Sequence, residues 1–149
     1  MLVERIEGKW IDVFSRVFEM CAVDNTQSAA ILSETQSRSV NVNLAELALD
    51  RLGIRPIHIV LPTLRQRAPV PIRSTGASDA IAGSIAVIKA LAAVDFVVDC
   101  TVEGLLHAPE LPEILSDGSR ILMVSNEHPE ALERLMPTED LEPKVKAGI

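Results

Sequence analysis

The stretch SDAIAGSIAVIKALAAVDFVVD, from Ser78 to Asp99, decides the fold predicted for this chain. The alanine-rich segment Ser78–Ala93 predicts a long helix, with Ser78 as a candidate N-cap and Asp79 suited to the positive end of the helix dipole. The next segment, Asp95–Asp99, is short and apolar, as a buried strand would be. A helix followed at once by a buried strand indicates one unit of an α/β fold.

Outward from this unit, short apolar runs alternate with helical patterns in both directions. Strands are expected at Ser28–Ser33, Pro56–Leu61, Asp95–Asp99 and Arg120–Val124. Helices are expected at 2–21, Leu44–Leu52, Ser78–Ala93, Pro109–Leu115 and Pro129–Met136, and after Pro137. Gly53 is a candidate left-handed cap, and Asn126 is a candidate cap of the helix at Pro129. The alternation predicts one α/β domain over residues 1–149: an open, mostly parallel sheet of about four strands with helices on both faces, a Rossmann-like three-layer arrangement.

Composition narrows the classes of protein. Hydrophobic residues make up 48% of the 149 residues and aromatic residues 3%, so the core is expected to be aliphatic. The net charge of −7 disfavours a free-standing nucleic-acid binder. No apolar run approaches the roughly 18–20 residues that span a membrane. Cys21 and Cys100 lack metal-like spacing and are interpreted as reduced thiols of a cytoplasmic protein.

Ligands of an open parallel sheet bind beyond the carboxyl ends of its strands. The candidate segments are therefore those that follow the four strands: Glu34–Ser39, the surface loop Pro62–Thr75, Cys100–His107 and Ser125–His128. His58, His107 and His128 lack the short spacings of a local metal site, so no metal is expected on this chain alone. The segment Ser74–Ser78 resembles a phosphate-binding turn but lacks the known glycine patterns, which favours an ordinary helix cap.

The residues Leu105, Leu106 and His107 follow the third strand inside a predicted loop. One interpretation is that the leucines cover the core and the histidine is a surface residue. The other is a pocket wall, in which leucines contact an apolar ring and the imidazole exchanges a hydrogen bond or a proton with a hydroxyl group of that ring. The residues alone leave both interpretations open.

An ordered series of short pieces carries a family resemblance. The pieces are Val23–Ser28, Val97–Asp99, Leu105–His107 with Pro109 and Glu110, Arg120–Leu122, and Met136–Asp140. With them the chain resembles the N-terminal region of the 2,5-dihydroxypyridine 5,6-dioxygenases, iron(II)-dependent ring-cleaving enzymes of nicotinate degradation. It is similar, more loosely, to leucyl aminopeptidases of the aminopeptidase-T type. Two departures from the dioxygenase pattern, Asn25 in place of an acid and a longer spacer before Leu105, leave open which hydroxylated ring is bound.

The resemblance implies a two-domain enzyme, of which this chain is the N-terminal domain and is inactive alone. Its Fe(II) would be held by two histidines and a carboxylate of a C-terminal domain beyond Ile149, with none bound by this chain. Leu106 and His107 map onto the family's substrate-binding pair, and His107 is then also the candidate catalytic residue. The implied partners are a small aromatic or pyridine substrate, the C-terminal metal-binding domain and, as a possibility, further copies of the chain, with no nucleic acid and no membrane.

Two other classes of function remain as alternatives. The first is the N-terminal domain of an aminopeptidase-T-type metallopeptidase, which would carry two metal ions outside this chain. The second is a non-catalytic binding or assembly module. In that case the apolar first helix, with Trp10, Phe14 and Phe18, would pack on its own core or on another subunit.

Overall fold

The computed structural model describes residues 4–65 and 76–134. Its helices are α1 (Gly8–Met20), α2 (Ser39–Arg51), α3 (Ile85–Ala93), α4 (Leu111–Leu115) and α5 (Pro129–Arg134), and its strands are β1 (Ala29–Glu34), β2 (Ile57–Leu61), β3 (Phe96–Asp99) and β4 (Arg120–Met123). The predictions for residues 66–75 of the loop, for residues 135 and 136 at the end of the last helix and for the chain after Pro137 lie outside the described residues. So does the matching piece Met136–Asp140.

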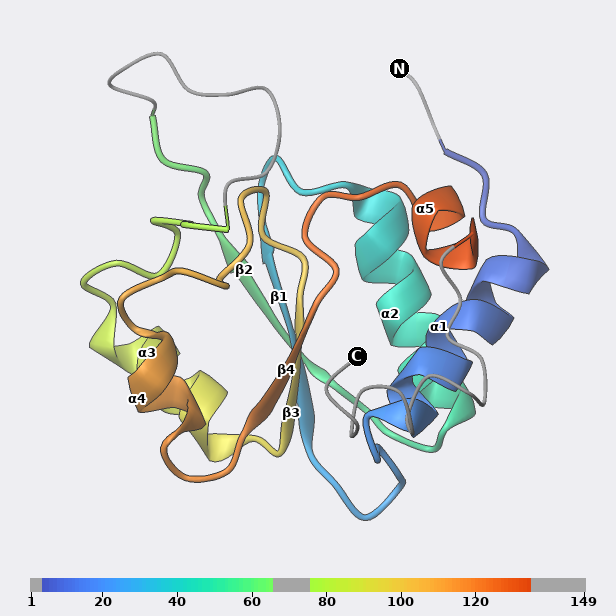
Figure 1. Ribbon diagram of the computed structural model, residues 1–149, viewed down its shortest axis with the longest axis horizontal. Helices are drawn as coiled ribbons and strands as arrows, with labels where there is room; N and C mark the ends of the chain where they lie inside the picture. The colour runs from blue at the N-terminus through green and yellow to red at the C-terminus, as the bar shows by residue number, and fades with distance from the viewer. Residues whose placement is uncertain (1–3, 66–75, 135–149) are drawn as a thin grey trace, which may run out of the picture.

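The four strands form one parallel sheet in the order β2-β1-β3-β4. Helices α1, α2 and α5 cover one face, and α3 and α4 cover the other (Figure 1). The predicted open, parallel, three-layer α/β fold is therefore confirmed. The strand order, which the sequence did not provide, places the reversal of direction between β1 and β3, because β1 leads through α2 to one side and β3 leads through α4 to the other.

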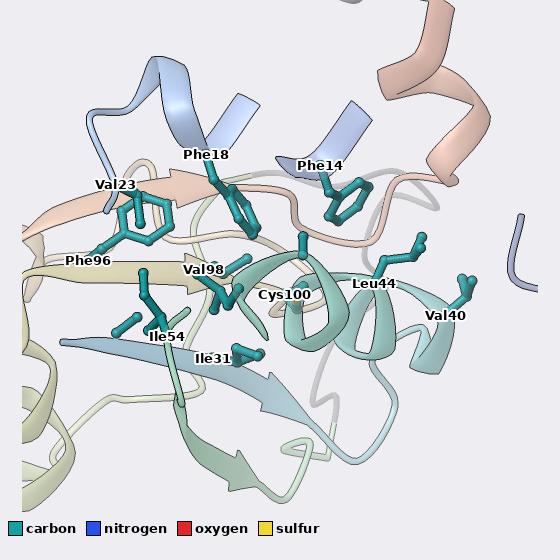
Figure 2. Packing of buried hydrophobic residues seen from close by; sticks show 14 residues of the cluster. Phe14, Phe18, Val23, Ile31, Val40, Leu44, Ile54, Phe96, Val98 and Cys100 are labelled. Carbon is teal, nitrogen blue, oxygen red and sulfur yellow. The ribbon is translucent and has the colours of Figure 1, made fainter. Parts of the chain in front are cut away.

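Alternate residues of the central strands point to opposite faces, as the period of a β-strand requires. Ile31 and Val98 pack with α1 and α2, and Figure 2 shows Phe14 and Phe18 pointing from α1 into this layer. Leu32 and Val97 belong to the second core, under α3 and α4. Every residue of β1 and β3 is buried, which accounts for the apolar residues Ala29–Leu32 and Phe96–Val98.

The first helix begins later than predicted. Residues 4–7 are not helical, and α1 starts at Gly8. The physical reason is that Glu4 is held by other parts of the chain: its carboxylate accepts from Arg38 at 2.8 Å and contacts Nε2 of His128 at 3.2 Å. Residues 2 and 3 of the helix predicted over 2–21 lie outside the described residues, and of the rest the prediction is correct from Gly8 to Met20.

The second helix begins earlier than the predicted Leu44, at Ser39. Its start depends on a contact distant in sequence, because Asn126 Oδ1 accepts a hydrogen bond from the backbone N–H of Arg38 at 2.9 Å. Asn126 was predicted to cap α5, and that prediction is wrong. His128 takes this place, since its Nδ1 accepts from the backbone N–H of Glu130 at 3.1 Å.

The helix predicted over Ser78–Ala93 is also shorter, and α3 starts at Ile85. Gly83 lies in the left-handed region at φ +73°, so it ends the preceding turn instead of continuing a helix. Ser78 does not cap α3: its Oγ accepts from the backbone N–H of Ala80 in a local turn. The fourth helix begins at Leu111 and not at Pro109, whereas Gly53 adopts the expected left-handed conformation.

Within residues 4–65 and 76–134, no helix is both long enough and apolar enough to cross a membrane.

Candidate functional site

A cavity of about 410 Å³ and another of about 380 Å³ lie on two sides of the carboxyl end of β4. The smaller one contains the predicted pocket residue Leu106 and is called here the edge cavity. Its lining consists of Gly76, Gly104, Leu106, Met123, Val124, Ser125 and Glu127. These residues come from the end of β4, from the segments after β3 and β4, and from the segment that precedes α3. The edge cavity therefore lies where ligands of open parallel sheets bind.

The segment after β3 is folded around the carboxylate of Asp99, the last residue of that strand. Asp99 is fully buried, and its Oδ1 accepts from the backbone N–H of Thr101 at 3.0 Å and from Thr101 Oγ1 at 2.6 Å. Its Oδ2 accepts from the backbone N–H of Leu105 at 2.8 Å. The Oγ1 of Thr101 in turn accepts from the backbone N–H of Gly104 at 3.1 Å. One buried acid thus fixes the path of the chain from 99 to 105.

Two hydrogen bonds link the segments that follow β1 and β3, where the strand order reverses. The Oε2 of Glu34 accepts from the backbone N–H of Val102 at 2.6 Å. Ser37 Oγ donates to the backbone carbonyl of Cys100 at 2.6 Å. The edge cavity lies one strand away from these contacts, beside β4.

Burial acts on the two acids of this region. The pKa of Glu34 is raised by desolvation and, to a lesser extent, by the negative charge of Asp99, while the hydrogen bond from Val102 lowers it. Desolvation also raises the pKa of Asp99, against the hydrogen bonds from Thr101 and Leu105 that favour its ionised form. The partners of Asp99 are all donors, so it is an acceptor that shapes the loop.

The tip of the same loop is fastened to the segment before α3 by three backbone hydrogen bonds. Gly76 donates to the carbonyl of Glu103 at 2.6 Å, Ser78 donates to that of Gly104 at 2.9 Å, and His107 donates to that of Gly76 at 2.5 Å. Two of the hydrogen bonds occupy the N–H groups of Gly76 and Ser78. The phosphate-binding interpretation of this turn therefore loses these two donors. The helix cap that the sequence favoured at this turn is not formed either, because Ser78 does not cap α3.

Two glycines make the close approach possible. A Cβ on Gly104 would lie 2.5 Å from Ser125 Oγ, and Gly104 has φ +80°. A Cβ on Gly76 would lie 3.2 Å from Cδ2 of His107 and 3.3 Å from Cβ of Leu106. Ser125 has φ +54°, an uncommon conformation for a residue with a side chain. At Gly76 and Gly104 the wall of the edge cavity is thus formed by backbone that lies close to neighbouring side chains.

The structure separates the two leucines that the sequence placed together. Leu105 is fully buried in the second core, whereas Leu106 is 57% exposed and lines the edge cavity. The interpretation as core cover holds for Leu105, and only Leu106 is available to a ligand. His107 is exposed, and its ring lies beside Gly76, which belongs to the lining. Leu106 therefore belongs to the wall of the edge cavity, and His107 lies at its rim.

The other two histidines have structural partners, and the two cysteines are free. Nε2 of His58 lies 3.0 Å from Oε1 of Glu46 on α2, and His128 begins α5 as described above. Cys21 and Cys100 are free thiols. Desolvation raises the pKa of both thiols, and Cys100 is fully buried, so neither resembles an activated nucleophile.

Within the described part of the chain, no group of three or more His, Cys, Asp or Glu side chains is arranged to hold a metal ion. These residues therefore do not fit an iron site by themselves.

Asp99 was not among the residues that the sequence suggested for the site, whereas Glu34 and Ser125 begin two of the candidate segments but had no role assigned to them. Asp99 had a recognisable signal, because Asp-x-Thr favours a local turn in which the acid accepts from the threonine. The same pattern occurs at Asp24 and Thr26, whose backbone N–H donates to Asp24 Oδ1 at 2.8 Å. Nothing local to Glu34 or Ser125 indicates their partners.

Comparison with known proteins gives a consistent result. The family model for 2,5-dihydroxypyridine 5,6-dioxygenase (NicX) matches residues 9–149. The 2,5-dihydroxypyridine 5,6-dioxygenase of Pseudomonas putida KT2440 is 37% identical over 138 residues, covering 91% of this chain and 39% of the relative. The solved structure of 2,5-dihydroxypyridine dioxygenase from the same organism matches with a TM-score of 0.78 and 36% identity, over 88% of this chain and 38% of that one.

This chain thus spans about two fifths of the length of the proteins that it matches. The comparisons favour the dioxygenase interpretation over the aminopeptidase and the non-catalytic module. The family match covers more than nine tenths of the sequence, and the solved relative shares its fold. The chain belongs to the 2,5-dihydroxypyridine 5,6-dioxygenase family.

Proposed function

We propose that this chain is the N-terminal domain of an iron(II)-dependent ring-cleaving dioxygenase that acts on 2,5-dihydroxypyridine or a similar hydroxylated ring in nicotinate degradation. It supplies one wall of the substrate pocket. The activity for which the Pseudomonas putida relative is named supports the reaction and the substrate class. The two free thiols support a cytoplasmic protein.

The observation that carries the proposal is the fastened loop beside the edge cavity. Asp99 holds the base of the loop and Gly76 holds its tip, so hydrogen bonds fix the backbone that carries Leu106 and His107. A half-exposed leucine offers apolar area to a planar ring, and an imidazole next to it offers a donor or an acceptor near neutral pH. This pairing suits a substrate that is flat, apolar on its faces and hydroxylated at its edge.

In the proposed enzyme, Leu106 contacts the face of the ring and excludes water from it. His107 exchanges a hydrogen bond with a ring hydroxyl and accepts or returns its proton. The described residues do not fit an iron site, so we assign the iron ligands to a C-terminal domain and assign no step of the reaction to the metal here. Further copies of the chain are compatible with this arrangement.

The first test is activity. The protein that carries this chain is incubated with iron(II), and dioxygen uptake is measured with 2,5-dihydroxypyridine and with other hydroxylated pyridines. Uptake that matches the loss of the ring is expected. Absence of ring cleavage with every substrate of this class would refute the proposed function.

The second test concerns the two residues. Leu106→Ala removes part of a ring contact and is expected to raise KM by about 5- to 10-fold, which corresponds to about 1 kcal/mol of apolar contact. His107→Ala is expected to lower kcat by about 100-fold or more. Leu115→Ala is the matched control, because Leu115 is an exposed leucine (41%) on α4 outside the edge cavity. Unchanged turnover and affinity in His107→Ala would remove His107 from the mechanism.

A further inference from the structure

The edge cavity contains a polar side chain that has no part in the proposed function, the hydroxyl of Ser125. Ser125 follows β4, belongs to the lining and is half-buried. In residues 4–65 and 76–134, the buried side-chain atoms without a hydrogen-bond partner are Asn41 Oδ1, Glu110 Oε2 and Arg120 Nε. The Oγ of Ser125 is not one of them, and no described residue forms a hydrogen bond with it. It is therefore an accessible, unpaired oxygen in a residue that lines the cavity.

Three features of the chain hold this hydroxyl in place. The backbone N–H of Ser125 donates to the carbonyl of Asp99 at 2.8 Å, and that of Val124 donates to the same carbonyl at 3.0 Å. Ser125 has φ +54°, which a residue with a side chain adopts only at a cost in free energy. Gly104 leaves room for the hydroxyl, since a Cβ there would lie 2.5 Å from Ser125 Oγ. A strained residue in the wall of a cavity is a candidate for a role in binding.

Two glycines connect Ser125 to the candidate substrate-binding residue His107. A Cβ on Gly104 would also lie 3.8 Å from Cα of Gly76, and a Cβ on Gly76 would lie 3.2 Å from Cδ2 and 3.8 Å from Nε2 of His107. Ser125, Gly104, Gly76 and His107 therefore follow one another in space. The two polar side chains stand at the ends of this row, and the residues between them have no side chain.

The charge of the lining favours a neutral partner for Ser125. Glu127 is the charged member of the lining that the described residues provide, and its carboxylate disfavours an anionic group on a ligand. A serine hydroxyl both donates and accepts, so it suits a neutral hydroxyl group, which does the same.

We infer that Ser125 recognises the substrate of the proposed dioxygenase, and that its Oγ exchanges a hydrogen bond with one ring hydroxyl while His107 bonds to the other. Positions 2 and 5 of a pyridine ring lie opposite one another, so hydroxyls at these positions point in opposite directions, as the two ends of the row require. Ser125 then selects rings with two opposite hydroxyls over rings with one. This inference rests on the proposed function and adds to it the residue that recognises the second hydroxyl.

Binding of three rings to the protein that carries this chain tests the inference. The rings are 2,5-dihydroxypyridine, 2-hydroxypyridine and 3-hydroxypyridine, and each of the last two lacks one of the two hydroxyls. Dissociation constants are measured by calorimetry without dioxygen, so that no ring is consumed, and weak ligands are measured by competition with 2,5-dihydroxypyridine.

Ser125→Ala and Ser125→Gly both remove the hydroxyl, and only Ser125→Gly also removes the strain of the positive φ. Both variants are expected to bind 2,5-dihydroxypyridine about 5- to 10-fold more weakly, the effect of one hydrogen bond. They should weaken only one of the two monohydroxy rings by a similar factor, and His107→Ala should weaken the other. Glycine accepts a positive φ, so Ser125→Gly is expected to fold.

The control is Ala22→Gly, because Ala22 also has a positive φ, of 60°, but follows α1 and does not line the edge cavity. It should leave all three affinities unchanged. Equal losses for the three rings, or a loss in Ser125→Gly that Ser125→Ala lacks, would overturn the inference, because the backbone and not the hydroxyl would then be responsible. Unchanged binding in both Ser125 variants would overturn the role of Ser125 and leave the proposed function standing. No binding of any ring to the unsubstituted protein would refute both.

Discussion

Replacement of Asp99 by Asn tests the claim that one buried carboxylate shapes the loop beside the edge cavity. Asn keeps a single acceptor oxygen, whereas Asp99 accepts from Thr101 through Oδ1 and from Leu105 through Oδ2. Whichever way the new amide turns, its NH2 group faces a backbone N–H. A lost hydrogen bond to a charged acceptor costs about 1.5–3 kcal/mol, and a buried donor left unpaired costs about 1–3 kcal/mol.

Part of this loss is recovered, because Asn carries no charge and burial already disfavours the ionised form of Asp99. We therefore expect the free energy of unfolding to fall by about 3 kcal/mol. Urea unfolding followed by circular dichroism measures the change. With a slope of about 2 kcal/mol per molar urea, the midpoint should fall by about 1.5 M.

The control is Asp95→Asn, just before the opposite end of the same strand. Asp95 is exposed, and its Oδ2 accepts from the backbone N–H of Ser28 at 2.9 Å and from Ser28 Oγ at 3.2 Å. Water can replace these partners, so this variant should lose less than about 1 kcal/mol. If Asp99→Asn is no more destabilising than Asp95→Asn, the reasoning about the buried carboxylate is wrong.

Three further predictions follow from the same region. Burial raises the pKa of Glu34 in the folded state. The free energy of unfolding, measured relative to that of Glu34→Gln, should therefore be highest at low pH and fall as the pH rises through that raised pKa. A parallel pH profile for the two proteins would contradict this prediction. Gly104→Ala meets Ser125 Oγ and a positive φ, and should lose about 1–2 kcal/mol in urea unfolding, where an unchanged midpoint would count against the close approach. The Cys100 thiol, buried and with a raised pKa, should react with a thiol reagent only after denaturation, and rapid labelling of Cys100 in the native protein would disprove it.

Much of the fold followed from local patterns, and the differences have identifiable physical causes. The apolar runs at β1 and β3 are visible because every residue of those strands is buried. The start of α2 is not visible, because Ser39, Asn41 and Asn43 are poor helix formers and the first turn is supported by Asn126 from the far end of the chain. The start of α3 was misplaced because Gly83 was taken as a helical residue, whereas it adopts φ +73°.

The candidate site was only partly predictable for a similar reason. Periodicity located the segment after β3, and a family resemblance pointed to Leu106 and His107. The assignment of opposite roles to Leu105 and Leu106 required the structure, because two adjacent leucines have the same hydropathy and differ only in direction. The partner of Glu34 lies 68 residues away, and no local pattern encodes a contact at that distance.

The contacts that begin α2 have a consequence for local unfolding. Glu4 binds Arg38 and His128, Asn126 binds the N–H of Arg38, and Asn41 binds the carbonyl of Glu127. The segment before α1, the first turn of α2 and the entry to α5 therefore share their hydrogen bonds. Amide protons in these three places are expected to exchange with solvent as one cooperative unit, although more than 120 residues separate its ends.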